Sequence, residues 1–83
     1  MGRRPKNETP VHNRLEAARE ARGLSRAELA DAADVHYQTI GYIERGEYSP
    51  SLSLALTLAR VLDTDVHQIF SLEPFITQKE TLP

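Results

Sequence analysis

The sequence is divided into short helix-forming segments, each with its own start and stop signals. The clearest start is Ser25-Arg26-Ala27-Glu28, a capping box in which the serine and glutamate side chains satisfy each other's free backbone amides. Three apolar residues follow at helical spacing, namely Leu29, Ala30 and Ala33. Asp34 then tolerates a left-handed backbone conformation better than most residues that have a side chain. We therefore predict a helix over residues 26–33 that ends in a tight connection.

Four other segments carry comparable signals. Pro10 suits the first position of a helix, and Gly23 suits the position just past its end. A second capping box, Asp65-Val66-His67-Gln68, opens the last segment. The predicted helices cover residues 10–22, 26–33, 37–45 and 51–62, followed by a short fifth helix that begins after Asp65. No segment alternates like a strand over enough residues for a sheet, so we predict an all-α, five-helix domain.

These helices place a folded domain at residues 10–70, between a polar, basic arm at 1–9 and an extended tail at 71–83. In the fourth predicted helix, the residues expected to face the core are Leu52, Ala55, Leu58, Ala59 and Leu62. The tail contains three further apolar residues, Leu72, Phe75 and Ile76. The core does not account for these three, so we expect them, together with the fifth helix, to form the surface through which two copies pair.

Charge is distributed unevenly along the chain. The net charge is −2, but residues 1–45 hold eight bases against seven acids, whereas residues 46–83 hold two bases against five acids. DNA phosphates respond to local clusters of positive charge rather than to the sum over the chain. The overall charge therefore weakens non-specific DNA binding without excluding a specific site.

Several classes of protein are disfavoured by the residues present. The chain has no cysteine, and its three histidines, His12, His36 and His67, lie on different segments without metal-ligand spacing, so no metal or cofactor is expected. Ser25 is explained by capping and has no neighbouring base, which argues against an enzyme. The apolar stretch from Leu52 to Leu62 is interrupted by polar residues, and no secretory signal is recognised, so we expect a cytoplasmic protein.

The second and third predicted helices have the properties of a DNA-reading pair. Small residues at Ala30 and Ala33 let two helices meet at a steep angle, and the exposed face of residues 37–45 is then free to enter a major groove. The start of the earlier helix offers free amides and Arg26, which suit a backbone phosphate.

With these features, the sequence resembles the Xre/Cro-type helix-turn-helix family, which includes lambdoid phage repressors. The motifs are Leu24-Ser25-Arg26-Ala27-Glu28-Leu29-Ala30, Val35-His36-Tyr37-Gln38-Thr39-Ile40, Ile43-Glu44-Arg45-Gly46 and Pro50-Ser51-Leu52. The resemblance covers residues 11–70. It implies sequence-specific binding of a double-stranded operator, transcriptional control, and a homodimer that matches two half-sites.

The resemblance also implies roles for individual residues. The residues expected at the DNA are Ser25, Arg26, His36, Tyr37, Gln38, Thr39, Tyr42 and Arg45. Tyr37, Gln38 and Tyr42 correspond to base readers, and Arg26 and Arg45 to phosphate contacts. Arg19 and Glu44 correspond to a buried ion pair.

Two departures from the family pattern stand out. His36 replaces the usual serine or threonine cap of the reading helix, and Gly41 lies in the middle of that helix. Glycine there costs roughly 1 kcal/mol relative to alanine, which suggests close approach to DNA or a partner. The alternative function is an antitoxin, with a toxin as partner, or another protein-binding module built on the same fold.

Overall fold

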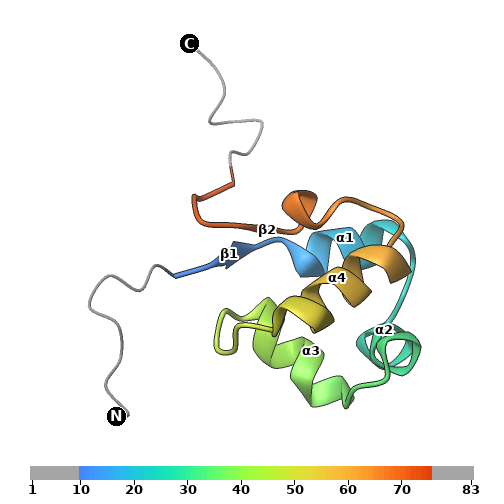
Figure 1. Cartoon of the computed structure of the whole chain (residues 1–83). Helices are drawn as coiled ribbons and strands as arrows, with labels where there is room; N and C mark the ends of the chain where they lie inside the picture. The colour runs from blue at the N-terminus through green and yellow to red at the C-terminus, as the bar shows by residue number, and fades with distance from the viewer. Residues whose placement is uncertain (1–9, 76–83) are drawn as a thin grey trace.

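A computed structural model describes residues 10–75 of the chain. It contains four α-helices, one turn of 3-10 helix and a pair of very short strands (Figure 1). In chain order the elements are β1 (His12–Asn13), α1 (Leu15–Ala21), α2 (Arg26–Ala33), α3 (Tyr37–Glu44), α4 (Leu52–Val61), η1 (Val66–Gln68) and β2 (Phe70–Ser71). The predicted basic arm, with Arg3, Arg4 and Lys6, lies outside the described residues, as does Ile76.

The first helix begins later than the sequence pattern predicted. Residues 10–13 are not helical, and α1 starts at Leu15 because Asn13 Oδ1 accepts a hydrogen bond from the Leu15 backbone amide at 3.0 Å. Arg14 is the N-cap residue, and its side chain makes no capping hydrogen bond. The prediction of a helix over residues 10–22 was therefore wrong at its start, since it gave precedence to Pro10.

Two further predictions need correction. Residues 12–13 pair in antiparallel fashion with residues 70–71, His12 opposite Ser71 and Asn13 opposite Phe70, so the domain is not purely helical. The predicted fifth α-helix is a single 3-10 turn: Asp65 caps its start by accepting from the His67 amide at 3.3 Å, but the chain then enters β2 and pairs with β1. Such short strands carry no alternating sequence pattern by which they could be recognised.

The core lies where α1, α2, α3 and α4 meet. Its fully buried large side chains are Leu15, Leu29, Ile40, Ile43, Leu58, Leu62 and Ile69. Four of the five residues expected to face inward from the fourth helix are buried, but Leu52 is 74% exposed. Leu52 is the first residue of α4, so its side chain lies at the edge of the helix packing.

The connection between α2 and α3 has the predicted local geometry. The capping box at Ser25 and Glu28 is complete, and Asp34 ends α2 in the left-handed conformation with φ 61°. The Val35 amide donates to the Ala30 carbonyl at 3.0 Å, and Val35 packs against the core. α2 contacts both α3 and α4, so the orientation of α3 is fixed by the rest of the domain (Figure 1). None of the helices within residues 10–75 is long and apolar enough to cross a membrane.

Candidate nucleic-acid interface

The start of α3 is organised by an unusual cap. The His36 ring nitrogen Nδ1 accepts a hydrogen bond from the Gln38 backbone amide at 3.1 Å. The imidazole also stacks on the Tyr37 ring, with 4.9 Å between ring centroids. His36 therefore substitutes for a serine or threonine cap by using a ring nitrogen as the acceptor, and it fixes the first turn of the helix.

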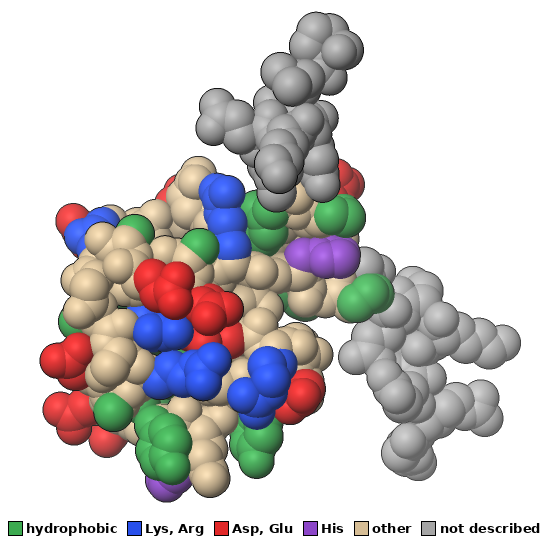
Figure 2. Space-filling view, turned by 180° about the vertical axis from the view of Figure 1, so that it is seen from behind, with side chains coloured by type: hydrophobic (Ala, Val, Ile, Leu, Met, Phe, Trp, Pro, Cys, Tyr) green, Lys and Arg blue, Asp and Glu red, His purple; other side chains and the backbone are tan. Residues whose placement is uncertain are grey.

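A shallow depression lies on the exposed face of α3 beside the start of α2. Its lining residues are Arg26, Tyr37, Gln38, Gly41, Tyr42 and Arg45, and its volume is about 160 Å³. Figure 2 shows this side of the molecule, where arginine side chains and exposed hydrophobic side chains gather close to one another. Five of the eight residues that the sequence placed at the DNA thus share one surface.

The other three of the eight do not line this depression. The Ser25 hydroxyl caps α2 and accepts from the Glu28 amide at 3.0 Å, and His36 caps α3. Thr39 is half-buried on another side of α3. Ser25 and His36 therefore serve the starts of α2 and α3.

Glu44 holds two arginines rather than one. Its side chain is 1% exposed, and Arg19 Nε donates to Oε2 at 2.7 Å while Arg26 Nε donates to Oε1 at 2.8 Å. Arg19 also donates through Nη1 to the Leu24 carbonyl at 2.8 Å. The hydrogen bond to Glu44 raises the pKa of Arg19 above its ordinary value. The cluster therefore joins α1, α2 and α3 through one carboxylate.

The second arginine of this cluster was not foreseen as a partner of Glu44. Arg26 was expected to contact only phosphate, but its Nε is engaged by Glu44 while its side chain remains 41% exposed. Arg26 also lines the depression beside α3. Two guanidinium groups against one carboxylate leave a net charge of +1, so the cluster presents positive charge at the surface.

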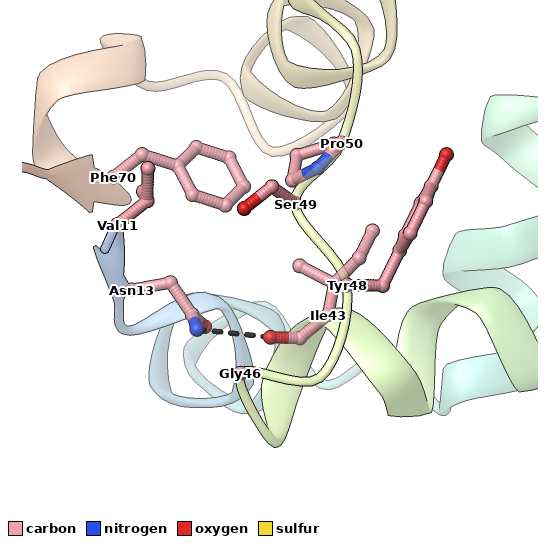
Figure 3. Close-up of a pocket in the computed structure, with 8 residues that line it drawn as sticks. All are labelled: Val11, Asn13, Ile43, Gly46, Tyr48, Ser49, Pro50 and Phe70. Atoms are coloured by element: carbon pink, nitrogen blue, oxygen red, sulfur yellow. Dashed lines mark hydrogen bonds between the residues drawn. The ribbon is translucent and has the colours of Figure 1, made fainter. Parts of the chain in front are cut away.

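Sequence reasoning also missed Asn13. Its side chain accepts from Leu15, as described above, and its Nδ2 donates to the Ile43 carbonyl at 2.9 Å (Figure 3). Ile43 belongs to the last turn of α3, and its carbonyl also accepts from the Gly46 backbone amide at 3.0 Å. Asn13 thus ties the start of the domain to the end of α3. No local sequence pattern marks this contact, because its partners are 30 residues apart.

A separate apolar groove is formed by α4, η1 and β2. Its apolar lining residues are Val11, Pro50, Leu52, Ala55, Val66, Phe70 and Leu72. It shares no residue with the depression on α3. Phe75, expected on the same surface as Leu72, instead lies against Arg14, whose guanidinium carbon is 4.5 Å from the ring centroid.

Proteins with similar sequences are described as helix-turn-helix transcriptional regulators. An uncharacterized HTH-type transcriptional regulator from Archaeoglobus fulgidus is 35% identical over 60 residues, which are 72% of this chain and 86% of the relative. The HTH-type regulator YgzD from Bacillus subtilis is 34% identical over 63 residues, 76% of this chain and 96% of the relative.

Solved structures and a family model agree with these relatives. The restriction-modification controller protein C.AhdI from Aeromonas hydrophila has a TM-score of 0.63 at 35% identity, covering 65% of this chain and 82% of its own. The clp gene regulator ClgR from Corynebacterium glutamicum has a TM-score of 0.61 at 29% identity. The match covers 63% of this chain and 55% of the ClgR chain. The helix-turn-helix model HTH_3 matches residues 15–69. The chain therefore belongs to the HTH_3 helix-turn-helix family of DNA-binding transcriptional regulators.

Proposed function

We propose that this protein regulates transcription by inserting α3 into the major groove of a short double-stranded DNA operator. The observation that carries this proposal is the single exposed surface on α3 that combines two arginines with an amide and two tyrosines. A major groove accommodates one helix, and base edges there present a distinct hydrogen-bonding pattern for each base pair. An exposed helix face with this chemistry fits such a groove.

The residues divide by chemistry into those that can contact base edges and those that can contact backbone phosphates. Gln38 offers one donor and one acceptor, which can pair bidentately with adenine from the first turn of α3. Tyr37 and Tyr42 are exposed beside it and can contact bases or sugar-phosphate. Arg26 and Arg45 supply positive charge for backbone phosphates. Contacts to phosphate set the orientation of α3, and Gln38 contributes sequence preference.

The protein acts as a homodimer in this proposal, and the apolar groove is its pairing surface. Leu52 and Leu72 are 74% and 63% exposed, and both line the groove. Because the groove and the depression on α3 share no residues, a second copy and DNA can be bound at the same time. Operators with two half-sites match a two-fold symmetric protein.

Dimer formation can be tested by placing a charge in the groove. Leu52→Glu puts a carboxylate into the apolar interface at the first turn of α4, a position that favours acidic residues for helix stability. We expect a monomer in sedimentation equilibrium and weaker binding to a two-half-site duplex, with binding to a single half-site unchanged. Leu56→Glu is the matched control, since Leu56 is half-exposed on the same helix but does not line the groove. Dissociation by the control alone would contradict the assignment.

The proposed function itself is tested by selecting bound duplexes from a random DNA library. We expect an enriched sequence whose affinity falls with salt. If the dimer neutralises roughly six phosphates, the plot of log affinity against log salt has a slope of about −5. Failure to enrich any sequence, or a slope near zero on the selected duplex, would contradict the proposal.

A further inference from the structure

Gly41 occupies the middle of α3, where the helical backbone conformation does not require glycine. Glycine weakens a helix interior relative to alanine. The glycines that adopt a positive φ in the described part of the chain are Gly23 and Gly46, so the backbone of Gly41 is one that alanine would adopt without strain. Its presence therefore calls for an explanation in the space beside it.

That space is filled by the guanidinium group of Arg45. A Cβ atom on Gly41 would stand 3.1 Å from Arg45 Nη1, closer than side chains normally pack, and 3.7 Å from Nη2, an ordinary van der Waals distance. The guanidinium carbon lies 5.3 Å from the centroid of the Tyr42 ring, and Arg45 Nε is 3.3 Å from Glu47 Oε1. Arg45 thus folds back one helical turn and lies against the backbone of α3, with Tyr42 and Glu47 as its neighbours.

We infer that Gly41 is a positioning residue, which lets Arg45 present its charge over the middle of the reading helix. This inference rests on the proposed DNA-binding function. Arg45 belongs to the end of α3, yet its guanidinium lines the same depression as Arg26 and Gln38. The Arg45 side chain remains 48% exposed, so it keeps donors available for a ligand. Arg26 and Arg45 therefore act on the DNA backbone from one shared surface, and not from opposite ends of the motif.

Partial pre-ordering of Arg45 follows from this arrangement. A free arginine side chain loses rotamer freedom when it binds phosphate. Contacts with Gly41, Tyr42 and Glu47 restrict that freedom before DNA arrives. A methyl group at position 41 requires the guanidinium to shift by a few tenths of an ångström from its place against the backbone of α3, while leaving the helix itself intact.

The expected effects of Gly41→Ala on stability and on binding have opposite signs. The melting temperature should rise or stay unchanged, because alanine favours the helix. Affinity for the selected duplex and for a random-sequence duplex should fall by up to about fivefold, which corresponds to the upper range for a solvent-exposed ion pair. Ser53→Ala, at an exposed position in α4, is the matched control for a helix-favouring substitution and should leave both affinities unchanged.

A double-mutant cycle with Arg45→Ala decides whether Gly41 acts through Arg45. In the Arg45→Ala background, Gly41→Ala should have no further effect on affinity, because the group it displaces is gone. An equal loss in both backgrounds would mean that Gly41 itself approaches DNA, and unchanged affinity of the single variant would mean that it positions nothing. Either result overturns the inference while leaving the proposed function in place. A wild-type protein that binds neither duplex would instead refute the proposed function, and the inference with it.

Discussion

Glu44→Ala should be the most destabilising substitution at any polar residue described above. It removes the carboxylate that holds Arg19 and Arg26 and leaves the Arg19 guanidinium nearly buried without an anionic partner. Breaking a buried ion pair by removing one partner costs about 3–5 kcal/mol. In a domain of this size, 1 kcal/mol corresponds to a shift in melting temperature of roughly 4–8 °C. We therefore expect the melting temperature to fall by more than about 10 °C in a thermal unfolding scan.

Two control variants distinguish the loss of the buried Arg19–Glu44 ion pair from the loss of a surface charge. Glu16→Ala removes an exposed carboxylate from α1 and should change stability by no more than about 0.5 kcal/mol. Arg26→Ala removes the exposed partner of Glu44 and should cost less than Glu44→Ala, because Arg19 still neutralises the carboxylate. A melting temperature of Glu44→Ala within a couple of degrees of the wild type would show that the cluster contributes little.

Gln38→Ala and Arg26→Ala should affect DNA binding in different ways. Loss of a bidentate base contact costs about 1–3 kcal/mol on the selected operator and little on random DNA. Loss of a phosphate contact lowers affinity for both duplexes and makes the salt slope shallower by about one unit per contact. Gln38→Ala should therefore reduce the ratio of specific to non-specific affinity, whereas Arg26→Ala should largely preserve it.

The measurement is a titration of each variant on the selected duplex and on a scrambled duplex at the same salt concentration. The backbone amide of Gln38, not its side chain, is held by the His36 cap, so Gln38→Ala leaves the start of α3 in place. An unchanged melting temperature verifies this point before the affinities are compared. If Gln38→Ala weakened both duplexes equally, or neither, α3 would not read bases from this residue.

Features encoded within a few consecutive residues could be predicted from the sequence. The bounds of α2, the capping box at Ser25 and the left-handed residue Asp34 agree with the structure. Helix caps and turns depend on hydrogen bonds between near neighbours, so their residue types identify them. The fold class was predicted apart from its fifth helix, which is a 3-10 turn, and the pair of short strands.

Features that join distant parts of the chain were decided by the packing of the helices. The partner residues are 30 apart for Asn13 and Ile43, and 18 apart for Arg26 and Glu44. No local pattern marks such contacts, because they exist only once α1, α2 and α3 have met around the core. The exposed Leu52 shows the same limit, since helical spacing predicts which residues share a face but not where the neighbouring elements end. The sequence alone thus determined the four α-helical segments, apart from the start of the first, and the Arg19–Glu44 pair implied by the family resemblance. Tertiary structure determined that Arg26 shares the Glu44 carboxylate and that Leu52 remains exposed, because both depend on how the helices pack.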